Sequence, residues 1–282
     1  MDCSKGRGGR GAFGRLLMAA VVCAAPFVVS AETVFITGAN SGLGLEFTKQ
    51  YLAKGWTVIA THRRSGIPET LAEVSAEYPG KVRVETLDVT DEAQAKALAA
   101  KLADVPFDIL INNAGVYNDR SSCASGDEDC PGDWTNQGFG RMNFELLDTI
   151  MDVNIKGPLI VSQSFYPNVQ AGKVKKIVAI SSSNGTLTGE ATPRPGAAFY
   201  RMSKAALNRE MQIVAASVKP DGVTVVILNP GPTLTERQEY LRGNPIMIEA
   251  SFTVENMINT IDRTTLEQSG RFWRYDGEPE KW

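Results

Sequence analysis

The sequence predicts an α/β fold, a doubly wound parallel sheet of about seven strands with helices on both faces. Three observations predict it. From residue 33 onward, short runs rich in β-branched residues alternate with segments of helical periodicity, the pattern of repeated βα units. A glycine-rich turn follows the first of these runs. The 282 residues, 43% of them hydrophobic, suffice for one large domain of this class.

Six strands are predicted in chain order, each a short run of Val, Ile, Leu or Thr bounded by polar or glycine-containing segments. They cover residues 33–37, 56–61, 82–87, 108–112, 176–181 and 224–228. Two helices are clear: 92–102 has Ala and Leu at helical spacing after a cap-like Thr-Asp, and 200–218 is a long amphipathic run. The Gly- and Asp-rich segment 117–141 is too long for an ordinary connection.

Residues 1–31 are predicted to be a targeting segment that precedes the domain at 32–282. Basic residues near the start precede an uncharged stretch at 16–29, the layout of a signal peptide, and Ala31 suits cleavage after it. The stretch is shorter than the roughly 20 residues of a membrane span, so no stable span is expected after processing. An organellar presequence and a true start at Met18 stay open. The protein is therefore exported to the periplasm or outside, or else cytoplasmic or organellar.

The composition argues against several partners. The formal charge of −3, with no long basic run, is unsuited to a phosphate backbone, so no nucleic acid is expected. One His and four scattered Cys lack the spacing of a zinc site, and no metal is expected. Cys123 and Cys130 flank a loop; a disulfide in an oxidising compartment and two free thiols are both open.

The turn after the first predicted strand suits a dinucleotide. It reads TGANSGLG and leads into a helix. Glycines let the backbone approach a pyrophosphate, and the helix N-terminus offers free N–H groups. The candidate cofactor-binding residues of this turn are Thr37, Gly38, Asn40, Ser41, Gly42, Leu43 and Gly44.

The end of the second strand favours NADP(H) over NAD(H). An acid that binds the ribose of NAD is expected there, and Arg63 and Arg64 occupy the place instead. Guanidinium groups suit the 2′-phosphate of NADP. His62 is interpreted as a bystander beside the adenosine, and Asp88, which ends the third strand, is placed to meet the adenine edge.

Tyr200 and Lys204 are candidate acid-base residues. They are four residues apart, so they lie on one face of a helix. A free tyrosine has a pKa near 10, and a neighbouring ammonium is expected to pull that pKa toward neutral. Ser182, after the fifth strand, is placed to hydrogen-bond a substrate oxygen beside them, with Ser183 as the competing choice.

Taken together, these residues resemble the short-chain dehydrogenase/reductase family. The marks are the TGxxxGxG turn, NNAG at 112–115, Asn154, and Tyr-x-x-x-Lys at 200–204 with its serine. YRMSKAALN at 200–208 and GRFWRYDG at 270–277 are similar to the C-factor-like branch of small carbonyl reductases. The resemblance covers the chain from residue 33 to its end. It implies a single-domain Rossmann fold and a homodimer or homotetramer that pairs through the helices after the fourth and fifth strands.

The resemblance also implies an NADP-dependent oxidoreductase that reduces an aldehyde or ketone to an alcohol, or catalyses the reverse. In it, Tyr200 gives the oxygen a proton, Ser182 polarises that oxygen, and Lys204 lowers the pKa of Tyr200 and holds the nicotinamide ribose. Asn154 positions a water that relays protons. The other cofactor contacts that it implies are Val89, Asn113, Ala114, Gly115, Pro230, Gly231, Thr233 and Thr235.

Two further expectations concern the function of the site and its substrate. The alternative to an enzyme is a non-catalytic, dinucleotide-binding regulatory protein on the same fold, because fold alone does not determine function. For the enzyme, the substrate is a small molecule, and an apolar pocket is expected from a set of large side chains. These are Tyr117, Trp134, Phe139, Leu187, Phe199 and Met247.

Overall fold

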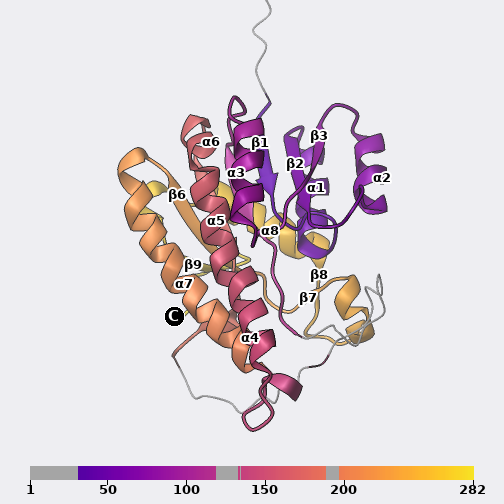
Figure 1. Ribbon diagram of the computed structural model, residues 1–282, viewed down its shortest axis with the longest axis vertical. Coiled ribbons are helices and arrows are strands. Elements are labelled where there is room, and N and C mark those ends of the chain that lie inside the picture. Colours follow the sequence, from indigo (N-terminus) through magenta and orange to yellow (C-terminus); the bar gives the residue numbers. More distant parts are fainter. Residues whose placement is uncertain (1–30, 119–132, 134, 189–196) are drawn as a thin grey trace, which may run out of the picture. The chain divides into compact units, whose positions relative to one another are not determined.

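Seven parallel strands form one sheet in the order β3-β2-β1-β4-β5-β6-β9 (Figure 1). The computed structural model describes residues 31–118, 133, 135–188 and 197–282. The strands are β1 (Thr33–Ile36), β2 (Thr57–His62), β3 (Val82–Thr86), β4 (Ile109–Asn112), β5 (Lys176–Ile180), β6 (Thr224–Asn229) and β9 (Phe272–Arg274). The doubly wound α/β fold is confirmed, and the six predicted strands agree with the first six within one residue at each end.

The helices alternate with the strands along the chain. They are α1 (Gly42–Ala53), α2 (Glu69–Glu77), α3 (Glu92–Lys101), α4 (Phe144–Met151), α5 (Gly157–Ser164), α6 (Tyr166–Ala171), α7 (Ala198–Val218) and α8 (Ala250–Arg263). The two helices expected from the sequence correspond to α3 and α7. Among the described residues, no helix has the length and apolar content to span a membrane.

Alternate residues of the central strands enter two hydrophobic clusters, one on each face of the sheet, because successive strand side chains point to opposite faces. Phe35 of β1 packs in a cluster with residues of α3, α5 and α7 such as Leu207. Its neighbours Val34 and Ile36 pack in the other cluster, with residues of α1 and α8 such as Phe47. Helices therefore cover both faces, as predicted.

The strand order reverses between β1 and β4. β2 and β3 extend the sheet on one side of this point, and β5, β6 and β9 extend it on the other. In open parallel sheets, ligands bind outside the carboxyl ends of the strands at such a switch point. The glycine-rich turn follows β1 and the NNAG segment ends β4, so both lie there.

Several short elements complete this edge. The π-helix η2 (Asp152–Lys156) joins α4 to α5, and the 3-10 helices η1 (Thr135–Gln137), η3 (Ser183–Gly185) and η5 (Glu236–Leu241) lie in connecting segments. After β6, β7 (Thr233–Leu234) and β8 (Ile248–Glu249) pair in a second small sheet. The remaining 3-10 helices are η4 (Lys219–Asp221) and η6 (Leu266–Gln268).

Some expectations fall outside the described residues. They concern the targeting segment up to residue 30, the pair Cys123 and Cys130, and Trp134. Each of these stays a prediction.

Candidate active site

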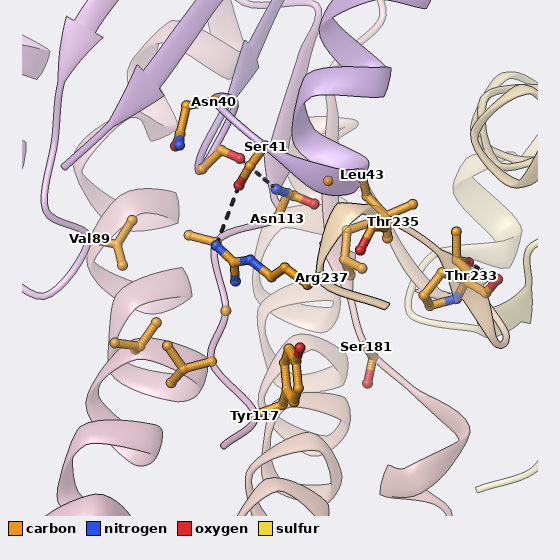
Figure 2. A pocket seen from close by; sticks show the side chains of 18 of the residues that line it. Asn40, Ser41, Leu43, Val89, Asn113, Tyr117, Ser181, Thr233, Thr235 and Arg237 are labelled. Atoms are coloured by element: carbon orange, nitrogen blue, oxygen red, sulfur yellow. Dashed lines mark hydrogen bonds between the residues drawn. The ribbon is translucent and has the colours of Figure 1, made fainter. Parts of the chain in front are cut away.

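A cleft of about 330 Å³ lies at the carboxyl edge of the sheet (Figure 2). The glycine-rich turn and His62 line one part of it, and Tyr200 and Lys204 line another. Seventeen of the predicted cofactor-binding residues line this cleft: Gly38, Asn40, Ser41, Gly42, Leu43, Arg63, Asp88, Val89, Asn113, Ala114, Gly115, Tyr200, Lys204, Pro230, Gly231, Thr233 and Thr235. Three do not: Thr37, Gly44 and Arg64.

The glycine turn has a geometry that other residues would disturb. Gly38 and Gly42 have φ angles of +65° and +55°, in the left-handed region that favours glycine. A Cβ on Gly44 would lie 2.2 Å from the carbonyl oxygen of Gly38. Gly44 is thus required for close packing of α1 on the turn, and it sits behind the cleft wall.

Thr37 and Asn113 brace this turn against β4. The Thr37 hydroxyl accepts hydrogen bonds from the backbone N–H groups of Asn113 and Ala114, both at 3.0 Å. The Asn113 amide donates to the carbonyl oxygens of Thr37 and Gly38 at 2.9 and 3.1 Å. Thr37 was expected to bind the cofactor, but it is buried with its hydroxyl turned to β4, so it positions the turn.

One part of the cleft carries groups suited to an adenosine phosphate. Arg63 lines it, as do Asp88 and the buried His62. Burial, and secondarily the charge of Arg64, lowers the pKa of His62, so the imidazole is neutral at pH 7. Arg64 lies outside the cleft lining, and the expectation that it also binds the cofactor stays a prediction.

Tyr200 and Lys204 line the other part, together with Ser181; Ser182 lies beside Tyr200 but is not part of the cleft lining. The Lys204 ammonium lies 5.7 Å from the centroid of the Tyr200 ring and donates to the carbonyl oxygen of Ile180 at 2.8 Å. Ser182 caps η3, and its hydroxyl is hydrogen-bonded to that of Tyr200. Ser183 is exposed. The structure thus brings Ser182, and not Ser183, beside Tyr200.

Burial sets the pKa values of the two acid-base groups. It raises the pKa of Tyr200 to about 12, and the hydrogen bond from Ser182 opposes this shift. Burial also lowers the pKa of Lys204 to about 8. In this structure the net shift of the Tyr200 pKa is therefore away from neutral, opposite to the direction expected from Lys204, because desolvation of the phenolate dominates.

Asn154 is buried and does not line the cleft. It sits in the π-helix η2, a rare element that often marks functional sites. Its side-chain oxygen accepts from the Val116 N–H at 2.9 Å, and its amide donates to the Val116 carbonyl oxygen at 2.7 Å and to the Ser203 hydroxyl at 2.9 Å. Asn154 therefore connects the segment after β4 to helix α7, and both of these elements flank the site.

The segment after β4 supports Tyr200 from a second side. Gln137, fully buried in η1, accepts from the backbone N–H of Tyr200 at 3.2 Å and donates to the carbonyl oxygen of Tyr117 at 2.8 Å. The Tyr117 ring packs edge-on against the Tyr200 ring, with 6.3 Å between the ring centroids. Its hydroxyl accepts from the Gln238 side chain at 3.1 Å. Tyr117 thus forms a polar wall next to Tyr200.

The expected apolar substrate pocket is largely wrong. Of the described members, only Tyr117 lines the cleft. Phe139 and Leu187 are 98% and 82% exposed, and Phe199 is buried in a core cluster with Leu146 and Ile150. The type of a large apolar residue does not show whether its side chain faces solvent, a core or a cleft. The pocket was predicted from residue type alone, which explains the error.

The family is decided by a comparison that covers most of the domain. Residues 32–245 match the sequence profile described as short chain dehydrogenase. The chain belongs to the short-chain dehydrogenase family. It is an oxidoreductase of that family, and the resemblance found in its motifs is confirmed.

Three known proteins illustrate what this chain is similar to. The C-signal of Myxococcus xanthus is 32% identical over 187 residues, 66% of this chain and 99% of that protein. An NADPH-bound carbonyl reductase from chicken fatty liver has a TM-score of 0.76 at 26% identity, covering 90% of this chain and all of the other. A short-chain dehydrogenase/reductase of Burkholderia multivorans with bound NADP has a TM-score of 0.72 at 28% identity, covering 89% of this chain and all of its own.

Several residues that line the cleft of this short-chain dehydrogenase were not predicted from the sequence, and two of them are charged or polar residues of η5. Arg237 and Gln238 follow Thr235 in η5 and line the cleft beside Tyr117. The segment around them has no periodicity, and its first turn is a 3-10 helix with a kink at Gln238. Their position directly after Thr235, a predicted cofactor contact, is the one signal that could have drawn attention to them.

Proposed function

We propose that this chain is an NADP(H)-dependent reductase that converts a carbonyl group to an alcohol, or catalyses the reverse, with Tyr200 as the general acid or base. The observation that carries the proposal is that Tyr200 and Lys204 line a cleft whose other part is lined by the glycine turn and Arg63, with Ser182 hydrogen-bonded to Tyr200. The structural neighbours that bind NADPH or NADP support it.

The described residues fit a dinucleotide. The glycine turn brings the N-terminus of α1 to the cleft, which Gly38, Gly42 and Leu43 line. The buried Nδ1 of His62 has no hydrogen-bond partner among the described residues, so a polar group beside it would satisfy it. Gly38, Ser41 and Leu43 would hold the diphosphate, and Arg63 the 2′-phosphate.

The chemistry follows from the protonation states of the chain's own groups. When bound, NADPH would supply the hydride that the substrate carbon accepts. With a pKa of about 12, Tyr200 holds its proton at neutral pH and can donate it to the substrate oxygen. Ser182 donates a hydrogen bond beside it, and the Lys204 ammonium stabilises the negative charge that Tyr200 acquires.

Selection of NADP(H) over NAD(H) rests on Arg63. It lines the cleft directly after β2, where no carboxylate follows the strand to bind a ribose hydroxyl. A guanidinium that pairs with the 2′-phosphate contributes a charge-assisted hydrogen bond absent with NADH. Exposed Arg64 is expected to contribute less.

The test is initial rates with NADPH and NADH on the chain from Glu32, against aldehydes, ketones, diketones and quinones. We expect a carbonyl substrate and a preference for NADPH that falls about tenfold in Arg63→Ala, the effect of losing one such contact. Arg64→Ala is the matched control and keeps the preference. Binding of NADPH with no turnover on any carbonyl would instead favour a regulatory, dinucleotide-binding protein.

The proposal includes a homodimer or homotetramer that pairs through α4, α5 and α7. These helices carry exposed large side chains, namely Phe144, Leu159, Met202 and Ile213. Sedimentation velocity of the wild type and of Ile213→Glu tests this, with dissociation to a monomer as the expected result for the variant.

A further inference from the structure

The segment after Thr235 places two opposite charges on the glycine turn. The carboxylate of Glu236 accepts a hydrogen bond from the backbone N–H of Gly42 at 2.7 Å. The guanidinium of Arg237 lies 3.4 Å from the Ser41 hydroxyl. Figure 2 shows Arg237 extending across the cleft from this segment to Ser41.

Glu236 provides a negative charge at the N-terminus of α1. Within the described residues, α1 has no acidic side chain in its first turn, and Ser41 makes no side-chain cap. The free N–H groups and the dipole of a helix attract an anion at this end. A carboxylate from 194 positions along the chain therefore occupies the region that a glycine-rich turn offers to a phosphate.

Arg237 provides the matching positive charge. Its guanidinium can form two parallel hydrogen bonds to phosphate oxygens. Because Ser41 belongs to the same turn, a group held by this turn lies within reach of Arg237 without a rearrangement of α1.

We propose that Arg237 binds the diphosphate of the dinucleotide, and that Glu236 competes with that diphosphate for the N-terminus of α1. The inference rests on the proposed function, since it takes a dinucleotide as the ligand. It assigns opposite effects to two adjacent residues: Arg237 strengthens binding of the dinucleotide, and Glu236 weakens it.

The experiment measures dissociation constants by isothermal titration calorimetry. Arg237→Ala is expected to raise Kd about tenfold for both NADPH and NADH, because the diphosphate is common to both. Arg63→Ala is expected to raise Kd for NADPH alone. Glu236→Gln keeps the shape of the side chain and is expected to lower Kd about threefold for both, through the loss of a like charge.

Matched controls come from the same segment. Arg242→Ala and Glu239→Gln change the net charge by the same amounts, but these residues pair with each other at the surface and do not line the cleft. Both are expected to leave Kd unchanged. ADP-ribose and 2′-AMP separate the two phosphate sites: Arg237→Ala should weaken the first ligand only, and Arg63→Ala the second only.

Three results would overturn the inference. If the wild type binds NADPH tightly and Arg237→Ala leaves this Kd unchanged, the role of Arg237 is rejected while the proposed function stands. The same holds if Arg237→Ala raises only the KM of a carboxylated substrate, because Arg237 would then bind the substrate. A Glu236→Gln variant that binds more weakly rejects the competition. A wild type that binds neither NADPH nor NADH rejects the proposed function, and this inference with it.

Discussion

At the scale of single residues, burial acts on Tyr200 and Lys204 in opposite directions. It keeps the phenol protonated, with a pKa of about 12, and brings the ammonium of Lys204 to a pKa of about 8. The two groups lie 5.7 Å apart, measured from the ammonium to the ring centroid. Lys204, and not Tyr200, therefore changes its charge near neutral pH.

This pair predicts the pH dependence of reduction. Below pH 8 Lys204 is charged and stabilises the phenolate that forms when Tyr200 gives up its proton, so kcat/KM should be constant. As the pH rises through about 8, Lys204 loses its proton and kcat/KM should fall. A pH profile between 6 and 10 with saturating cofactor measures it, and a rate that rises through this interval would contradict the assignment.

Gln137 is predicted to position Tyr200. Gln137→Leu removes the hydrogen bonds to the Tyr200 N–H and the Tyr117 carbonyl, and kcat should fall tenfold or more because a shift of about 1 Å can cost about a hundredfold. The Kd of NADPH should stay the same. Gln137→Glu keeps the acceptor for Tyr200 and should recover part of kcat.

The control for Gln137 is Phe139→Ala, an exposed change two residues on. It should leave kcat unaltered. Equal losses of kcat and of dinucleotide binding in Gln137→Leu would indicate general unfolding, and would reject the positioning role.

At the scale of elements, close packing of η3 on α7 brings the catalytic groups together. A Cβ on Gly185 would lie 2.6 Å from the carbonyl carbon of Lys204 and 2.9 Å from the N of Ala205. Only glycine lets the turn that begins at Ser182 lie directly against the helix that carries Tyr200.

Gly185→Ala is therefore predicted to move Ser182 away from Tyr200. We expect kcat/KM to fall about a hundredfold, the scale associated with misplaced catalytic groups, while Kd for NADPH changes less than about twofold. Ser183→Ala, in the same turn, is exposed and should retain activity. If Ser183→Ala lowered kcat/KM more than Gly185→Ala does, the choice of Ser182 over Ser183 would be reversed.

The elements differ in how far the sequence predicts them. The six long strands are runs of β-branched residues, so their positions could be predicted within one residue. β9 has three residues and the β7–β8 pair has two in each strand, too short for any periodicity. The π-helix η2 is a local change of hydrogen-bond register within a helical pattern, which side-chain spacing does not report.

At the scale of the whole molecule, residues 31–282 form one compact unit with both core clusters. We propose that residues 1–31 are a cleaved export signal and that the domain does not need them. The chain from Glu32 should unfold cooperatively at the Tm of the full chain and bind NADPH with the same Kd. N-terminal sequencing of exported protein should begin at Glu32, whereas a first residue at Met18 or earlier would contradict the proposal.

The site as a whole could be predicted only in part. Tyr200, Lys204, Ser182 and the glycine turn follow from short patterns at strand ends and on one helix face, where the fold class already places them. Arg237 and Gln137 reach the site from irregular segments, and only the three-dimensional structure shows their contacts. The pKa of Tyr200 depends on burial by distant parts of the chain, which the spacing of Tyr200 and Lys204 in the sequence does not report.

The central claim is that Tyr200 donates or accepts the proton in carbonyl reduction. The most direct test is NADPH oxidation by Tyr200→Phe with the best carbonyl of the panel, alongside calorimetric binding of NADPH. We predict a loss of kcat of about 10²–10⁴-fold, the usual contribution of a general acid, with Kd for NADPH unchanged. Turnover within about twofold of the wild type would contradict the account.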